Sequence, residues 1–208
     1  TIGERGDPLG EEELEAAPNL IHRYKDRALL LVTDRCPVYC RFCTRAYAVG
    51  SSTATAEKVS IKASRDRWAD IFKYLREHEE VEDVVISGGD AYRLKAKQII
   101  EIGEEVISIP HIRRFRFATK GLSVLPMKLL TDEPWIDAVA AVTNRAHNHY
   151  KEVCIHTHFN HANELTNITK DAMDLLMCKD VKVRNQTVFQ KGVNDTPEAM
   201  IDLVRRMS

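Results

Sequence analysis

The sequence has no long apolar run and no excess of charge of either sign. A membrane-spanning helix needs about 20 consecutive apolar residues, and no stretch approaches that length, so we expect no membrane partner. Lys and Arg number 30 and Asp and Glu number 31. A balanced charge creates no field that attracts nucleic acid, so no such partner is expected. The 208 residues suffice for one sizeable domain with its own core.

Cysteine is scarce outside one short segment. Three of the five cysteines, Cys36, Cys40 and Cys43, are spaced C-x3-C-x2-C. A structural zinc site usually shows two pairs of ligands, and no second pair is present, so zinc is the alternative rather than the first interpretation. Cys154 and Cys178 are single and lie in apolar-rich segments, which is typical of buried thiols. The pattern does not indicate a disulfide framework.

The crowded cysteines indicate an iron–sulfur cluster. Three thiolates on one loop can bind three corners of a [4Fe–4S] cluster, whereas an ordinary ferredoxin site supplies four ligands. The fourth iron is then open to a small molecule. This spacing is the signature of the radical S-adenosylmethionine (SAM) enzymes. Because oxidation damages a thiolate-bound cluster, we expect a reducing compartment, cytoplasmic or mitochondrial.

Short apolar runs alternate with longer stretches of helical periodicity from residue 27 onward. The expected strands are 28–33, 83–87, 114–118, 153–157 and 181–188, and the expected helices are 64–78, 94–107, 133–149, 169–178 and 196–207. This alternation predicts an α/β fold whose parallel sheet forms a partial (βα) TIM-like barrel of about five βα units. An open doubly wound sheet is the alternative, but no G-x-G-x-x-G motif follows the first strand.

Two regions are expected, an N-terminal arm at residues 1–27 and the barrel core at residues 28–208. Residues 1–18 are rich in Gly, Pro and Glu and predict an irregular arm with a short helix. Arg23 and Arg27 would point the same way if their stretch is helical or turn-like. Paired guanidiniums suit a phosphate or a carboxylate, although solvated surface charge is the alternative.

The ends of the expected strands carry further candidates, because active-site groups of βα folds collect there. Ser87, Gly88, Gly89 and Asp90 follow the second strand. The two glycines would let the backbone approach a ligand, and the aspartate could meet an ammonium group such as that of SAM. The alternative is a tight turn that Asp90 caps.

Histidines and amides follow the later strands. His156 and His158 would share one face of the fourth strand, and His161 lies past its end. A separate metal site is one interpretation, but no carboxylate is placed to complete it, and polar contacts to SAM or another cofactor are favoured. Gln186 lies on the fifth strand, where a buried amide needs a partner, so it is expected to face a ligand.

Taken together, these segments resemble the lysine 2,3-aminomutase family of radical SAM enzymes. The resemblance extends from about residue 7 to the end of the chain. It rests on His22-Arg23-Tyr24, Leu29 to Asp34, the cysteine loop with Thr44-Arg45, Ser87 to Asp90, Val124-Leu125-Pro126, Thr157 to His161, Asn185-Gln186 and Gly192 to Asp195.

The resemblance implies an isomerase that migrates an amino group from C2 to C3 of an amino acid. It would use a [4Fe–4S] cluster, SAM and pyridoxal 5′-phosphate (PLP), with reductive cleavage of SAM supplying a 5′-deoxyadenosyl radical. The three cysteines would bind the cluster, and Ser87 to Asp90, His158 and Gln186 would line the SAM site. Arg23 and Arg27 would bind the PLP phosphate, and Arg45 the substrate carboxylate. An electron donor such as flavodoxin or ferredoxin is expected, and a homo-oligomer is possible.

Two departures from the family pattern limit these expectations. The family follows its last cysteine with Thr-Arg-Arg-Arg, whereas this chain has Thr44-Arg45-Ala46-Tyr47. The family's PLP-linked lysine lies in a Gly-rich segment beyond the sixth strand, which this sequence does not contain, so no catalytic residue is assigned and a segment of a longer protein is expected. Another amino-acid substrate, a protein lysine, and cluster binding without turnover are the alternatives.

Overall fold

The protein contains a seven-stranded sheet in which the strands follow one another in chain order. The computed structural model describes residues 7–54, 57, 58, 61 and 65–208. The strands are β1 (Glu15–Ala17), β2 (Leu20–Tyr24), β3 (Arg27–Thr33), β4 (Asp83–Gly88), β5 (Arg114–Ala118), β6 (Glu152–Thr157) and β7 (Lys182–Asn185). Strands β1 to β3 pair antiparallel, and β3 to β7 pair parallel.

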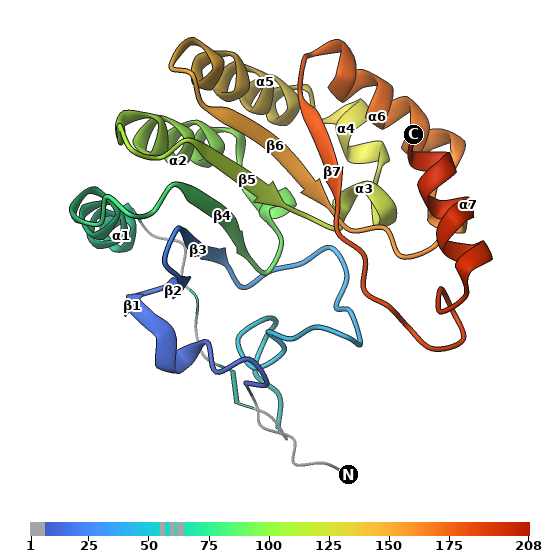
Figure 1. The fold of residues 1–208 in the computed structure, drawn as a ribbon, viewed down its shortest axis with the longest axis horizontal. Coiled ribbons are helices and arrows are strands. Elements are labelled where there is room, and N and C mark those ends of the chain that lie inside the picture. Colours follow the sequence, from blue (N-terminus) through green and yellow to red (C-terminus); the bar gives the residue numbers. More distant parts are fainter. Residues whose placement is uncertain (1–6, 55–56, 59–60, 62–64) are drawn as a thin grey trace.

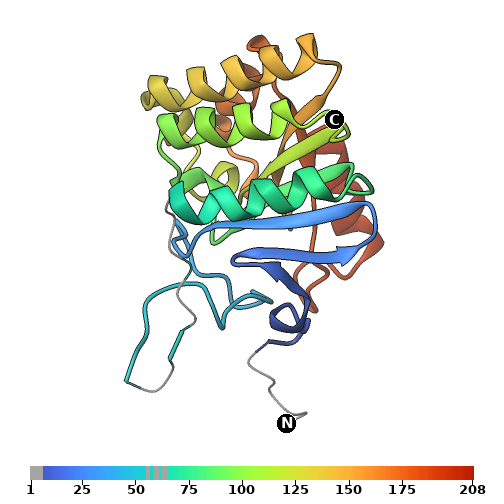
Figure 2. The same cartoon turned by 90° about the vertical axis from the view of Figure 1, so that its left-hand side faces the viewer.

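Helices connect the parallel strands and cover one side of the sheet, along an arc in Figure 1. The helices are α1 (Arg65–Glu77), α2 (Ala96–Ser108), α3 (Gly121–Val124), α4 (Met127–Thr131), α5 (Glu133–Asn148), α6 (Asn167–Cys178) and α7 (Pro197–Met207), and the 3-10 turns are η1 (Glu12–Leu14), η2 (Ala91–Arg93) and η3 (Ala162–Glu164). In Figure 2, α1, α2 and α5 lie side by side in one layer. None of the helices described is long and apolar enough to cross a membrane.

The alternation of side chains along the strands explains why the helices lie on one face. Ile86, Phe115 and Phe117 are buried in the main hydrophobic core beneath the helix layer. Successive side chains of a strand point to opposite faces, so Val85 and Arg116 lie on the other face. In the part of the chain that the structure describes, no helix covers this second face.

The strand order decides between the two sheet architectures that the sequence allowed. A doubly wound sheet reverses its strand order at a switch point and carries helices on both faces. Here the order runs from β1 to β7 without a reversal, so this alternative is wrong. The predicted α/β class with a parallel core is confirmed, and the sheet is open.

The N-terminal region differs most from the expectation. A 3-10 turn is present at Glu12–Leu14, but β1 and β2 follow it as strands and extend the sheet, where an irregular arm was expected. Lys25 and Asp26 form the turn of a hairpin between β2 and β3. Thr1 to Gly6 of the expected arm and Ser64, the expected first residue of α1, lie outside the described residues.

Candidate functional site

A cavity of about 830 Å³ opens at the carboxyl ends of the parallel strands. It extends onto the face of the sheet opposite the helices, where Val85 and Ala118 form part of its lining. Its volume lies in the range of small-molecule and cofactor sites. Most of the predicted site residues line it, namely Cys36, Cys40, Cys43, Arg45, Ser87, Gly89, Asp90, His158 and Gln186.

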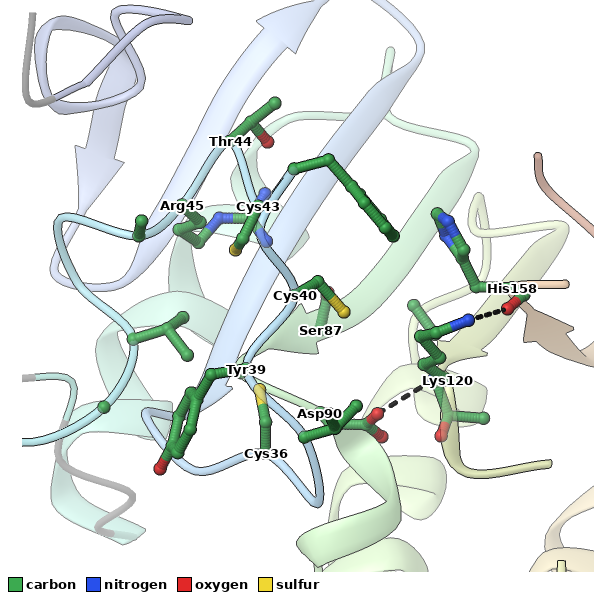
Figure 3. A pocket seen from close by; sticks show the side chains of 18 of the residues that line it. Cys36, Tyr39, Cys40, Cys43, Thr44, Arg45, Ser87, Asp90, Lys120 and His158 are labelled. Carbon is green, nitrogen blue, oxygen red and sulfur yellow. Dashed lines mark hydrogen bonds between the residues drawn. The ribbon is translucent and has the colours of Figure 1, made fainter. Parts of the chain in front are cut away.

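The three cysteines lie on the loop that follows β3 and line this cavity (Figure 3). The loop closes on itself because Gly50 N–H donates to the Asp34 carbonyl at 2.8 Å and Cys43 N–H donates to the Cys40 carbonyl at 3.1 Å. All three thiols are partly exposed and free of disulfides. They can therefore be reached from the cavity by a ligand that needs several sulfur donors.

Burial keeps two of these thiols protonated. Burial, together with Asp90 and the neighbouring cysteines, raises the pKa of Cys36 to about 12. Burial also raises the pKa of Cys40, while the nearby Lys120 ammonium opposes that shift. Iron binds thiolate, so a metal must displace these protons on binding.

The geometry tests which metal groups the cysteines fit. Among the described residues, no three His, Cys, Asp or Glu side chains are close enough to hold one metal ion. In a cubane cluster each cysteine binds a different iron, so its ligand sulfurs stand farther apart than those around one ion. The three cysteines line one cavity, so one cluster bound there would be within reach of all three.

Gly88 and Gly89 join the end of β4 to the cysteine loop. Gly89 N–H donates to the Thr33 carbonyl at 2.5 Å, and Asp90 N–H donates to the Arg35 carbonyl at 2.9 Å. Gly88 has a φ of 103°, and a Cβ on it would meet the Thr33 oxygen at 2.6 Å. The close approach that these glycines permit is therefore to the end of β3 and to Arg35 at the start of the cysteine loop.

A Gly89→Ala substitution tests this contact. The new Cβ would lie 2.5 Å from the Arg35 carbonyl oxygen, which is backbone and cannot rotate away. We expect the free energy of unfolding in urea to fall by about 1–3 kcal/mol, and the loop cysteines to react faster with a thiol reagent. In the control Gly192→Ala the Cβ meets nothing within 4 Å, although φ is 74° there. If the loop cysteines of Gly89→Ala react as slowly as those of the wild type, the contact of Gly89 with Arg35 does not control the position of the cysteine loop.

Asp90 combines the two roles that the sequence left open. Its Oδ1 accepts from Tyr92 N–H and its Oδ2 from Lys120 N–H, each at 2.8 Å. It therefore caps η2 and ties the end of β4 to the end of β5. Burial raises the pKa of this carboxyl, and the side chain still lines the cavity. The prediction that it meets a SAM ammonium remains open.

Arg45 is buried at the cavity with a carboxylate partner that the sequence analysis missed. Its Nε and NH2 groups donate to the two oxygens of Glu11, each at 2.7 Å, and its NH1 donates to the Gly88 carbonyl at 3.1 Å. Its side chain is 14% exposed. The arm, the cysteine loop and the end of β4 therefore meet at this guanidinium. The only signal for Glu11 was a run of three glutamates, which indicates surface charge.

His158 lines the cavity and carries a buried, unpaired ring nitrogen. Its ring stacks on Phe42 of the cysteine loop, with centroids 5.3 Å apart and an angle of 15° between the planes. Its Nε2 is buried without a hydrogen-bond partner in the described structure. Burial and then Lys120 lower the pKa of His158, so the neutral ring is favoured. A buried orphan nitrogen of this kind fits a polar ligand.

The other histidines do not form a metal site with His158. His156 also lines the cavity, and its Nδ1 lies 3.4 Å from Arg116 NH1. His161 instead caps η3, where its Nδ1 accepts from Asn163 N–H at 3.1 Å. One ring nitrogen of His156 and one of His161 are thus engaged in hydrogen bonds within the protein.

Gln186 lines the cavity, as expected, but it is the neighbouring amides that hold the strand ends together. Asn185 Oδ1 accepts from Phe159 N–H at 2.7 Å. The buried Asn160 accepts from Val188 N–H at 2.9 Å through its Oδ1. Buried Asn194 donates to the Asn160 carbonyl at 2.8 Å. These asparagines fix the loops after β6 and β7, which the sequence analysis did not anticipate.

Lys120 is a further cavity residue to which the sequence analysis gave no role. Its Nζ donates to the Glu164 carboxylate at 2.8 Å and to the His158 carbonyl at 2.9 Å. Figure 3 shows it beside Asp90 and His158, across the cavity from the cysteines. Lys120 thereby fixes the segment that follows β6, and it adds a positive charge near Cys40.

Arg23 and Arg27 have separate partners in this structure, and their role at a PLP phosphate stays a prediction. Their stretch is a hairpin rather than a helix, and neither residue lines the cavity. Arg23 donates to the Leu9 carbonyl of the arm. Arg27 pairs with Asp83 at the start of β4, at 3.2 Å. Asp83 also forms ion pairs with Arg114 at 2.9 Å and with Arg116 at 2.8 Å. Three guanidiniums therefore contact this one carboxylate near the amino ends of β3, β4 and β5.

Comparison with known proteins places these motifs in context. No model of a known protein family matches the chain. An L-lysine 2,3-aminomutase of Fusobacterium nucleatum is 35% identical over 198 residues, 95% of this chain and 43% of that protein. That of Clostridium subterminale is 35% identical over 201 residues, 97% of this chain and 44% of that protein. A glutamate 2,3-aminomutase of Clostridioides difficile is 35% identical over 189 residues, 91% of this chain and 41% of that protein.

The chain spans about half the length of the curated relatives it matches. The aligned part contains both the cysteine loop and the later strand ends that line the cavity. The resemblance to the lysine 2,3-aminomutase family that the motifs predicted is confirmed along nearly the whole chain.

Proposed function

We propose that this chain is the cluster-binding and SAM-binding part of a radical SAM 2,3-aminomutase. The observation that carries the proposal is the shared cavity. Three free cysteines on the loop after β3 face the same space as the Gly89-Asp90 edge, His158 and Gln186. The names of the relatives support an aminomutase, an isomerase of amino acids.

The sheet topology supports the finer prediction of a partial barrel. Five parallel strands in chain order with helices on one face are the arrangement of a (βα) barrel that has not closed. The helix-free face would then be the barrel interior. A cavity at the carboxyl ends of the strands is where barrel enzymes bind their substrates.

The residues present define what the protein would contribute to the reaction. When bound, the cluster and SAM supply the electron and the radical chemistry that activate a C–H bond. Cys36, Cys40 and Cys43 would hold the cluster at the cavity wall. His158 would donate or accept one hydrogen bond through its orphan Nε2. Arg45 would orient a carboxylate.

PLP enters this proposal only through the resemblance to aminomutases. Arg23 and Arg27 have separate partners in this structure, so they do not form a preformed phosphate site, and we derive no step through PLP. The relatives named as lysine and glutamate 2,3-aminomutases favour a free amino acid over a protein lysine as substrate. A screen of lysine, glutamate and arginine for β-amino acid products would identify it.

The proposal predicts that the reconstituted protein cleaves SAM. After anaerobic reconstitution and reduction with dithionite, we expect 5′-deoxyadenosine to be released from SAM, measured by liquid chromatography. Protein without reductant and protein without iron are the controls, and both should leave SAM intact. If SAM survives although the cluster is intact and reduced, the radical SAM function is wrong for this chain.

A further inference from the structure

Glu11 is a buried carboxylate that the proposed function leaves without a role. Its side chain is only 6% exposed, although it lies in the N-terminal arm. Its oxygens accept from Arg45 NH2 and Arg45 Nε, each at 2.7 Å. Tyr47 O–H donates to the same carboxylate at 3.0 Å. Two parallel hydrogen bonds fix the plane of the Arg45 guanidinium, and the Tyr47 hydroxyl in turn fixes the Glu11 carboxylate.

The hydrogen bonds of Arg45 leave part of its guanidinium for a ligand. An arginine side chain has five N–H donors in a rigid plane. Two of them bind Glu11 and one binds the Gly88 carbonyl, which leaves two without a partner among the described residues. Arg45 lines the cavity, so these donors belong to a residue that a ligand can reach.

We propose that Glu11 is a positioning residue that fixes Arg45 so that its remaining donors receive the α-carboxylate of an amino-acid ligand. This inference rests on the proposed function, since that function brings amino acids into the cavity. Both the substrate and SAM carry an α-carboxylate. The resemblance points to the substrate, and the test below separates the two sources.

Two opposite effects would follow removal of Glu11, and their sign decides the inference. A positioned guanidinium loses its orientation when Glu11 is removed, so binding of a carboxylate weakens. If Glu11 instead only competes with a ligand for the Arg45 guanidinium and neutralises its charge, removal of Glu11 frees the guanidinium, so binding of a carboxylate tightens. The bidentate geometry and the separate Gly88 contact support the first effect.

The experiment compares ligands that differ only in the carboxylate. Binding to the anaerobically reconstituted protein is measured by calorimetry for L-lysine against cadaverine and for L-glutamate against 4-aminobutyrate. SAM against decarboxylated SAM forms the third pair. We expect Glu11→Ala to weaken binding of one carboxylate ligand about tenfold, because a charge-assisted contact is lost, and to leave its decarboxylated partner unchanged.

Milder variants keep the test interpretable if Glu11→Ala does not fold. Glu11→Gln retains an acceptor for one arginine donor and should restore part of the affinity. Tyr47→Phe removes only the hydroxyl that holds Glu11 and should weaken the carboxylate ligand about twofold to threefold. Circular dichroism and thermal melting report whether each variant is folded.

The outcomes separate this inference from the proposed function. Equal changes for both members of every pair, no change, or tighter binding of the carboxylate ligand would overturn the positioning role. A wild-type protein that holds a reducible cluster without cleaving SAM would overturn the proposed function instead. An effect confined to the SAM pair would support positioning and assign the carboxylate to SAM.

Discussion

Replacing Cys40 by alanine will remove most of the iron that the protein binds. The wild type should take up about four irons per chain on anaerobic reconstitution, and the variant should retain only a small fraction, because a cubane with two cysteine ligands is not held stably. Cys154 and Cys178 do not line the cavity, so neither is placed to replace Cys40. Iron analysis and the visible absorption of the cluster measure the effect.

The chain provides a matched control for this experiment. Cys178 is an exposed cysteine at the end of α6, far from the cysteine loop in sequence and outside the cavity lining. Cys178→Ala should bind the full complement of iron. If Cys40→Ala also keeps its full iron content, the ligand assignment is wrong. Zinc in place of iron in the purified wild type would restore the alternative that the cysteine pattern allowed.

Replacing Asp83 by alanine will produce the largest loss of stability of any single polar substitution that we predict. The Asp83 side chain is 2% exposed and pairs with Arg27 of β3 and with Arg114 and Arg116 of β5, the two strands that flank β4. Without it, the positive charges of β3 and β5 face one another across the start of β4. Breaking a buried ion pair typically costs about 3–5 kcal/mol. Arg27 and Arg114 are 39% and 42% exposed, so water offsets part of the cost and we expect about 3 kcal/mol.

Urea unfolding of the wild type and the variant measures this difference. Asp83→Asn keeps the volume and the acceptor oxygen but loses the charge, so its loss should be intermediate. Asp174→Ala breaks an exposed pair with Lys170 on α6 and should change the free energy of unfolding by less than about 0.5 kcal/mol. A loss below 1 kcal/mol in Asp83→Ala would show that the three arginines do not depend on this carboxylate.

The parallel core was predictable because its signals are local. The strand at 114–118 was predicted with the bounds that β5 has, and the predicted strand at 28–33 differs from β3 by one residue. Buried strands in a parallel sheet are short apolar runs, and the helices between them repeat every 3.6 residues, so a window of the sequence contains the information. The last strand was predicted to residue 188, but β7 ends at Asn185, whose side chain binds the loop after β6.

The hairpin of β1 and β2 was missed because its sequence has little strand character. Glu15–Ala17 is too short for a periodic signal and consists of Glu and Ala, which are depleted in strands. Leu20–Tyr24 contains a histidine and an arginine beside its apolar residues. Pairing with β3 makes these segments strands, so tertiary context overrides local preference. Cys178 likewise lies in an apolar-rich segment but is exposed, because it falls at the exposed end of α6.

The sequence by itself determined the cysteine loop, the alternation of strands and helices, and the set of strand ends that face one cavity. Spacing along the chain specifies these features, because the ligands of one loop and the period of one helix are short-range properties. Only the tertiary structure decided which polar groups meet: Glu11 with Arg45, Asp83 with three arginines, and Lys120 with the turn after β6. Such pairs join residues far apart in the chain, and their contacts depend on strand register and packing rather than on any local pattern.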